Sequence, residues 1–390
     1  ASVGNDLPAY QLYNTYNIGK DPNGGTTASR NEILFDPNVK NELIKSYEAG
    51  AELRLFANRL GLDFAIYKSN ATNQLLNLPL DPLSGYRFMK INSGDIQNTG
   101  IELTVDGKIL QNENGLNWDM GVNFSRNNNV VKSIKDDLNL YRLGGFDDVA
   151  VNAVKGQKYG EIYGSTFRRV EDTASPYYGQ LLLDANGLPQ VGNQNVRLGN
   201  QQANALLGIT NTFAYKGFNL SFLIDGRFGG KIFSATLAQM QRSGTSDKTV
   251  VNGLRENMVT PGVILNTTTN QYEQNTASVT PQQYWAAVAG VGNLGITEAN
   301  LYDASNIRLR NINLAYNFTP KMLEKTFIQR AKVGVSCNNV WLITSHMNGL
   351  DPESVFATNT NATGFENAAA PTTRSSISAF KRRPELCRIS

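Results

Sequence analysis

Asp225-Gly226-Arg227 is the polar cluster with the clearest potential for chemistry in this chain of 390 residues. A carboxylate and a guanidinium two residues apart share one side of an extended strand, because side chains alternate between its two faces. Phe222 and Ile224 occupy the opposite side. Asp225 and Arg227 could contact a polar solute or another protein segment. We favour a plainer interpretation, in which they form ordinary salt bridges on a water-facing surface.

Glu102 and Asp106 also share one strand face. Paired carboxylates can act as general acid and base, but two carboxylates on the watery side of a strand need no such role. The sequence has no nucleophile elbow, phosphate-binding loop or HExxH motif, and its single histidine, His346, is interpreted as a polar loop residue. We therefore expect no enzyme. Asp225, Arg227, Glu102 and Asp106 remain as candidates for contacting a solute.

Asp351-Pro352-Glu353 offers two carboxylates that a calcium ion could use. Calcium sites in proteins need about six to eight oxygen ligands, so this tripeptide supplies too few by itself. Proline fixes its own backbone angle, which suits a tight turn. The sequence therefore predicts a rigid turn here, and we expect neither a metal site nor a cofactor.

The elements that position these residues are best seen between Leu116 and Asn127, where apolar and polar residues alternate with period two. The apolar row is Leu116, Trp118, Met120, Val122 and Phe124, and the polar row is Asn117, Asp119, Gly121, Asn123 and Ser125. Such a segment is typical of a strand with one face against an apolar phase and one against water.

The same alternation recurs in strands of about 9–14 residues, a length that suits a tilted strand across a bilayer. The segments are 42–56, 60–67, 101–106, 116–127, 207–215, 218–227, 307–318 and 331–341. Tight turns near Asn58, Gln111, Lys216 and Pro320 alternate with loops of tens of residues. Short turns on one side and long loops on the other indicate an outer-membrane barrel.

The composition agrees with this architecture. Charged residues make up 18% of the chain, below the roughly 25% of ordinary soluble domains. No run of about 18 apolar residues is present, so no membrane-spanning helix is expected, which leaves barrel strands open. The net charge of +3 comes without a basic stripe of interleaved aromatics, so we expect no nucleic-acid partner.

The sequence thus predicts an all-β fold, an antiparallel transmembrane β-barrel with long extracellular loops. We count eight spanning strands, a stub near Ala1–Asn5 and a partial strand near Thr373, and we expect the region 128–202 to lie above the membrane. The apolar phase slips by one residue between Leu309 and Ile312, which predicts a β-bulge. Residues 282–291 could form a short helix.

Several short motifs carry a resemblance to a known family. They are Ser2-Val3-Gly4-Asn5-Asp6, Asn98-Thr99-Gly100-Ile101-Glu102, Trp118 with Asn123-Phe124-Ser125-Arg126-Asn127, Tyr215-Lys216-Gly217-Phe218, Asp225-Gly226-Arg227-Phe228-Gly229-Gly230, Ile307-Arg308-Leu309-Arg310-Asn311-Ile312-Asn313-Leu314, Asn338-Asn339-Val340 and Gly349-Leu350-Asp351-Pro352-Glu353. In this order and spacing the chain resembles the C-terminal barrel portion of SusC/RagA-like TonB-dependent outer-membrane transporters of the Bacteroidetes.

The resemblance implies part of a twenty-two-stranded barrel in the outer membrane. It also implies import of a nutrient, an oligosaccharide or a peptide, captured with a SusD-like surface lipoprotein. A TonB–ExbB–ExbD complex would drive the import through a plug domain. The Asn, Gln, Ser and Asp residues of the polar rows suit a neutral solute, and they suit a polar plug equally well.

Two other readings stay open. A self-contained eight-stranded barrel could serve as an adhesin or structural anchor in the outer membrane. A soluble all-β glycan-binding module is a third reading, but the apolar rows argue against it.

Residues 1–375 are expected to form the barrel portion, and residues 376–390 depart from the family pattern. The tail is charged and interrupted by Pro384, so it is interpreted as not strand-like. We attribute it to a frameshift or to an artefact of the cloned sequence. The alternative is a genuine divergent tail.

Overall fold

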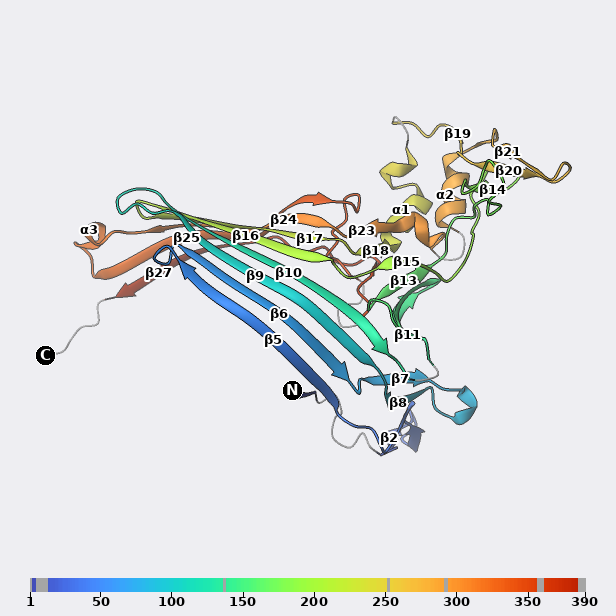
Figure 1. Cartoon of the computed structure of the whole chain (residues 1–390), viewed down its shortest axis with the longest axis horizontal. Helices are drawn as coiled ribbons and strands as arrows, with labels where there is room; N and C mark the ends of the chain where they lie inside the picture. Colours follow the sequence, from blue (N-terminus) through green and yellow to red (C-terminus); the bar gives the residue numbers. More distant parts are fainter. Residues whose placement is uncertain are drawn as a thin grey trace.

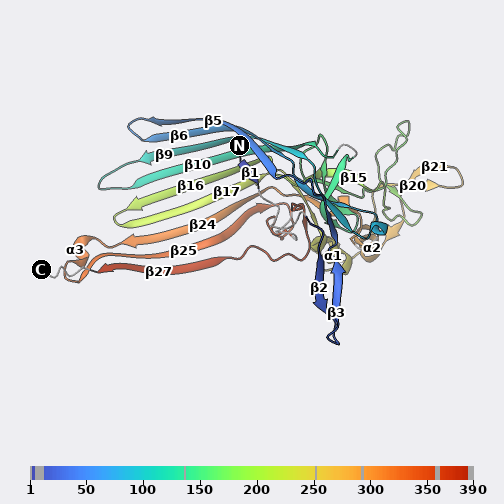
Figure 2. The same ribbon diagram turned by 90° about the horizontal axis from the view of Figure 1, so that it is seen from below.

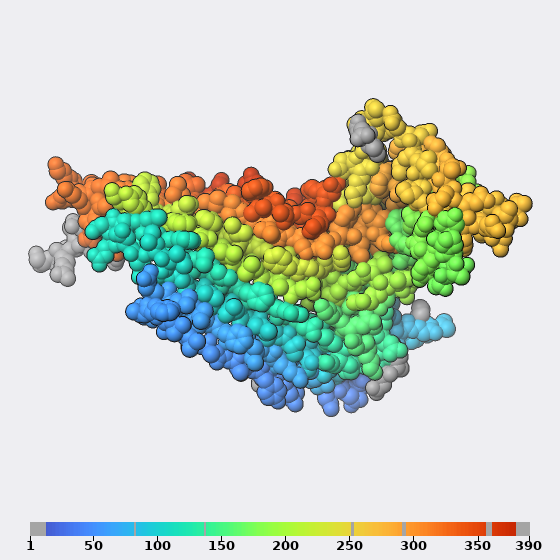
Figure 3. All heavy atoms as spheres, turned by 45° about the horizontal axis from the view of Figure 1, so that its top comes forward, coloured from blue at the N-terminus to red at the C-terminus, as the bar shows by residue number. Residues whose placement is uncertain are grey.

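One open antiparallel sheet of ten strands dominates the computed structural model, which describes residues 2–4, 13–135, 138–250, 253–290, 294–355 and 361–384. Its strands lie in chain order: β1 (Ser2–Gly4), β5 (Glu42–Leu55), β6 (Leu60–Thr72), β9 (Asp95–Leu110), β10 (Asn117–Ser133), β16 (Ala205–Tyr215), β17 (Phe218–Phe228), β24 (Asn306–Asn317), β25 (Ile328–Ser345) and β27 (Ser375–Pro384). Figures 1 and 2 show these strands side by side, and Figure 3 shows the same order as a progression of colours.

The predicted strand count is confirmed, with eight strands of 11–18 residues between a stub at one edge and a shorter strand at the other. The tight turns expected near Asn58 and Lys216 are also present. Backbone φ is positive at Phe56, Ala57 and Asn58, and again at Lys216 and Gly217. Such left-handed residues reverse the chain within hairpin loops of four residues (56–59) and two residues (216–217).

The predicted β-bulge lies at Arg310. Leu309 pairs with Ile224 and Asn311 pairs with Leu223, so Arg310 is the extra residue on β24. A bulge adds one residue to one strand of a pair and redirects its side chain. Arg308 and Arg310 therefore both reach the polar side of the sheet, while Leu309 remains on the apolar side.

The prediction that the tail after residue 375 is not strand-like is wrong. Residues from Ser375 to Pro384 form β27, which pairs antiparallel with β25 along most of that strand's length. Pairing uses backbone groups, so the exposed edge of β25 accepts a partner whose side chains do not alternate cleanly. Pro384 stands at the last position of the strand, where a missing N–H is tolerated. The rest of the tail, residues 385–390, lies outside the described residues.

The long loops gather at one end of the sheet and fold into a cap (Figure 1). Its largest sheet has the order β11 (Leu140–Phe146), β12 (Val149–Val154), β13 (Glu161–Gly164) and β15 (Val196–Asn200). As predicted, the region 128–202 adds no strand to the ten-stranded sheet beyond the end of β10. In the structure these long connections pack against one another. They surround a core of buried residues that consists of Val149, Val151, Ile162, Phe233, Ala235, Leu294, Ala362 and Phe365.

The remaining elements belong to the loops and turns. The small strands are β2 (Tyr16–Lys20), β3 (Thr26–Arg30), β4 (Ile33–Phe35), β7 (Leu75–Pro79), β8 (Phe88–Asn92), β14 (Leu182–Leu183), β18 (Lys231–Ser234), β19 (Met258–Val259), β20 (Val263–Asn266), β21 (Gln271–Gln274), β22 (Ser278–Val279), β23 (Leu301–Asp303) and β26 (Phe365–Glu366). The helical segments are η1 (Pro82–Ser84), α1 (Ala235–Ser243), η2 (Asp247–Thr249), α2 (Pro281–Ala289), η3 (Thr297–Asn300) and α3 (Pro320–Leu323).

Helix α2 confirms the short helix expected in residues 282–291. Thr280 and Gln283 cap its start reciprocally, with Pro281 in the first turn, an arrangement that satisfies two otherwise unpaired N–H groups. Among the described residues, no helix has both the length and the apolar character needed to cross a membrane.

The cap core yields a stability prediction. Phe233 is fully buried in it, so Phe233→Ala should destabilise the cap by about 3–5 kcal/mol through lost burial and a residual cavity. Protease resistance of the cap against urea, measured on the purified chain in detergent, reports this loss. Leu265→Ala is the control, because Leu265 is a cap residue with 40% of its surface exposed. Equal effects of the two variants would contradict the assigned core.

Candidate solute-facing site

Arg310 is the centre of an ionic cluster on the polar side of the sheet. Its Nη2 donates to Asp225 Oδ2 and to Glu353 Oε1, each at 2.6 Å, and its Nη1 donates to Glu353 Oε2 at 2.9 Å. Asn339 accepts a further hydrogen bond from Nη1 at 3.2 Å. One guanidinium thus links β17, β24, β25 and the connection between β25 and β27, which spans residues 346–374.

Arg308 makes a second link to the same connection. Its Nη2 lies 2.5 Å from Asp351 Oδ1, and its Nη1 donates to Thr372 Oγ1 at 2.8 Å. The Thr372 hydroxyl also donates to Asp351. The side chains of Arg308 and Asp351 are 4% and 10% exposed, so this pair is withdrawn from bulk water. Buried charges persist only when paired and hydrogen-bonded, which is the case here.

The rigid turn predicted at Asp351-Pro352-Glu353 is present. The Glu353 N–H donates to Asp351 Oδ1 at 3.0 Å, a turn that an aspartate side chain forms with backbone two residues on. Both carboxylates face arginines. Hydrogen bonds from Arg310 hold the pKa of Glu353 below its ordinary value. Burial raises the pKa of Asp351, but hydrogen bonds from Arg308 and Thr372 outweigh it and leave the pKa lowered.

The candidates Asp225 and Arg227 lie on β17 but have different partners. Asp225 pairs with Arg310. Arg310 was not among the residues predicted from the sequence, although the predicted β-bulge lies at this residue and could have indicated that its side chain is redirected. Arg227 Nη2 donates to the backbone oxygen of Gln201 at 2.7 Å. The buried atoms Asp225 Oδ1 and Arg227 Nε have no hydrogen-bond partner in the described part of the chain.

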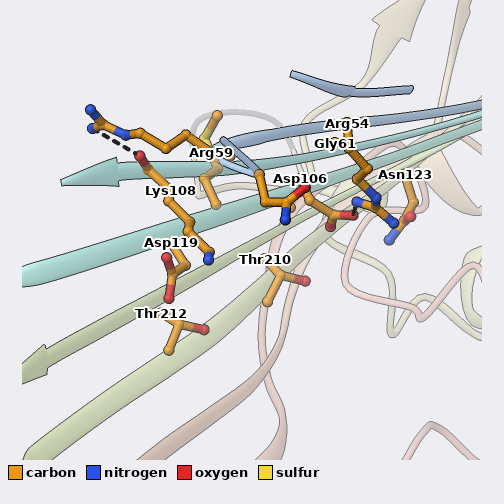
Figure 4. A pocket seen from close by; sticks show the side chains of 13 residues that line it. Arg54, Arg59, Gly61, Asp106, Lys108, Asp119, Asn123, Thr210 and Thr212 are labelled. Atoms are coloured by element: carbon orange, nitrogen blue, oxygen red, sulfur yellow. Dashed lines mark hydrogen bonds and ion pairs between the residues drawn. The ribbon is translucent and has the colours of Figure 1, made fainter. Parts of the chain in front are cut away.

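The other candidates, Glu102 and Asp106, lie on β9, which β10 and β16 separate from β17. Asp106 lines a hollow of about 810 Å³ near the short turns, whereas Glu102 does not line it. The hollow is bordered by Arg54, Asn58, Arg59, Gly61, Asp106, Gly107, Lys108, Asp119, Met120, Gly121, Asn123, Thr210 and Thr212. Figure 4 shows how the labelled residues are spread over neighbouring strands and the turn at Arg59.

Glycines shape this hollow. Arg54 lies across Gly61, where an added Cβ would be only 2.0 Å from Arg54 Nη1, and its Nη1 comes within 3.7 Å of Asp106 Oδ2. Gly61, Asp106 and Gly121 are register partners on successive strands. The hollow therefore exposes donors and acceptors side by side. Such a surface suits hydrogen bonding to polar groups.

The Arg308 pair yields a prediction. Arg308→Met leaves Asp351 buried without its partner, which should cost about 3–5 kcal/mol and loosen residues 346–374. Protease cleavage in this connection, followed against urea concentration, measures the change. Arg87→Met is the matched control, because the Arg87–Glu32 pair is 69% and 63% exposed and such pairs contribute about 0–1 kcal/mol. Similar losses in both variants would contradict the assignment.

The lowered pKa values predict an acid dependence. A carboxyl whose pKa is depressed on folding contributes stability that is complete above its unfolded pKa and is lost as pH falls through the folded pKa. With unfolded values of about 4, protease protection of residues 346–374 should be constant from pH 7 to pH 5 and should fall under stronger acid. The double variant Arg308→Met/Arg310→Gln should respond less to acid. Loss of protection already near pH 6 would refute this explanation.

Comparison with known proteins finds similarity to one family. Residues 2–158 match the family described as TonB dependent receptor-like, beta-barrel. TonB-dependent receptor P3 of Formosa agariphila is 27% identical over 341 residues, covering 83% of this chain and 32% of the relative. TonB-dependent receptor SusC of Bacteroides thetaiotaomicron is 24% identical over 371 residues, covering 90% and 34%. The chain thus spans about a third of the length of these curated relatives.

Solved structures show the same fold. The RagAB peptide transporter superposes with a TM-score of 0.68 at 18% identity, covering 98% of this chain and 40% of that one. The RagAB peptide importer in its closed-closed state gives a TM-score of 0.69, again at 18% identity. The relatives are named as receptors and transporters, in agreement with the expectation that this chain is not an enzyme. The chain is similar to SusC/RagA-like TonB-dependent receptors, whose β-barrel family matches residues 2–158, and its place is the bacterial outer membrane.

Proposed function

We propose that this chain forms part of the wall and the extracellular cap of an importer that carries an oligosaccharide or a peptide across the outer membrane. The observation that carries the proposal is the glycine-lined hollow on the polar face, which offers both donors and acceptors. A wall of this kind can hydrogen-bond a polar solute without holding it by net charge. Similarity to this family supports the same function.

Arg227 is the residue that we propose as a solute contact within the wall. Asp225 is already engaged by Arg310, whereas Arg227 is half-buried and its guanidinium donates from Nη2 to the backbone oxygen of Gln201. An arginine with free donors can bind a hydroxyl, a carbonyl or a carboxylate of a passing solute. Asp106 would contact either the solute or a polar plug. Glu102 has less support, because it lies outside the hollow.

The proposal includes two partners. A SusD-like surface lipoprotein would cover the cap from outside, and TonB–ExbB–ExbD would supply energy through a plug domain. A self-contained eight-stranded barrel has less support. The described sheet has ten strands, and its end strands β1 and β27 do not pair with each other. A closed barrel requires that its two edges meet.

Uptake in cells tests the proposal. Cells bearing the complete receptor should accumulate a fluorescent oligosaccharide or a fluorescent peptide, and deletion of tonB should abolish this. Arg227→Gln should lower uptake about 10-fold, as expected for the loss of a hydrogen bond to a charged group. Arg87→Gln, at an exposed pair on the cap side, should have no effect. Uptake that persists without TonB would rule out the proposed energy coupling.

A further inference from the structure

The cap contains a second hollow, which is separate from the hollow near the short turns. It has a volume of about 690 Å³ and lies beside the small sheet of β14, β20 and β21 at the far end of the cap (Figure 1). Its walls come from residues 166–172, from Tyr178, Gly179 and Leu182, and from residues 191–193, with Tyr272 of β21. None of these residues lines the hollow near the short turns.

One wall of this hollow is rigid. Glu298 accepts two hydrogen bonds from Arg169, at 2.7 and 3.0 Å, and a third from the backbone N–H of Phe167 at 2.9 Å. Behind this wall lies another hollow of about 670 Å³, which shares Phe167, Arg169 and Gly179 with the first. Gly179 has no side chain and no atom within 4 Å of its Cβ position. An extended ligand could therefore cross from one hollow to the other at Gly179.

The polar side chains of the first hollow are held in position. Arg168 donates to Gln190 at 2.9 Å, and Asn193 Nδ2 donates to Glu171 at 3.2 Å. Asp172 accepts from a backbone N–H in its own turn. Two arginines, Arg168 and Arg169, and two carboxylates, those of Glu171 and Asp172, line the same hollow, so the formal charges cancel. A charged ligand gains little from such a balanced site, whereas a neutral ligand with hydroxyl groups can use donors and acceptors together.

Aromatic rings complete the lining. Tyr178 is 60% exposed, and Phe167 and Tyr272 also border the hollow. A sugar ring presents C–H groups on its faces and hydroxyls around its edge, so it matches an exposed aromatic ring flanked by fixed polar groups. Such aromatic residues combine a large apolar surface with a polar tip.

A peptide fits this surface less well, because the backbone along the wall is already used. The N–H groups of Thr166, Arg168 and Val170 donate to Asn193, Gln190 and Gln180. The wall therefore offers few donors for pairing with an added strand, which is how extended peptides usually bind a sheet edge.

We propose that this cap hollow, centred on Tyr178, Asn193 and Arg168, binds a neutral oligosaccharide. The site is separate from the hollow near the short turns that we propose for solute import. Such a site would hold a saccharide at the outer end of the cap. The proposal does not depend on energy coupling or on transport, because binding needs only the folded cap.

Binding by the whole chain in micelles tests this. The chain is purified in a detergent without a sugar headgroup, such as lauryldimethylamine oxide, and titrated calorimetrically with maltoheptaose, xylohexaose, laminarihexaose and a neutral heptapeptide. At least one saccharide should bind. Tyr178→Ala and Asn193→Ala should each weaken that binding at least 10-fold. Both side chains are exposed, so the variants should fold.

Two controls separate this site from the rest of the chain. Tyr13→Ala removes another exposed tyrosine, 70% exposed, and should leave binding unchanged, as should Asn114→Ala at an exposed asparagine just before β10. The proposal is overturned by the absence of binding to all three saccharides, by preference for the heptapeptide, or by saccharide binding that Tyr178→Ala and Asn193→Ala leave intact. If TonB-dependent uptake fails while saccharide binding is intact, the proposed import function is contradicted and the proposed saccharide site is not.

Discussion

The rest of the structure depends on the need to pair every backbone N–H and C=O in an apolar phase. Lipid offers no hydrogen bonds, so a chain that crosses it as strands must pair each strand on both sides. This need explains why the eight long strands pair side by side in chain order, whether a tight turn or a long connection joins them. It also explains β27: the edge of β25 would otherwise present a long row of unpaired groups, and the tail fills it although its side chains follow no clean alternation.

Side-chain periodicity carried enough information to predict the wall but not its ends. Alternation with period two located the eight strands, and the one-residue slip at Arg310 located the bulge. Strands β9 and β10 run beyond their alternating segments, because the asparagines at their outer ends still pair through the backbone. The cap could not be predicted in this way. Its core joins Val151, Phe233 and Phe365, residues so far apart in sequence that no local pattern connects them.

The candidate site shows the same limit. Sequence placed Asp225 and Arg227 on one strand face, but whether each is paired depends on strands and loops elsewhere in the chain. The bulge brings Arg310 to Asp225, and the final connection brings Glu353 to the same guanidinium. Arg227 is left with a backbone oxygen as its acceptor. Two charges that looked equivalent in sequence therefore differ in what they can still bind.

The way in which the cap is attached determines what it can do. Strand β18 begins three residues after β17 ends, and it pairs with β23, which precedes β24, and with β26 from the final connection. A cap that swung open would break these pairings and expose the core around Phe233 and Phe365, and both costs oppose such a motion. Arg308 and Arg310 add ionic links from the wall to the same connection. These pairings, the shared core and the two arginine links therefore hold the cap to the sheet as a fixed platform.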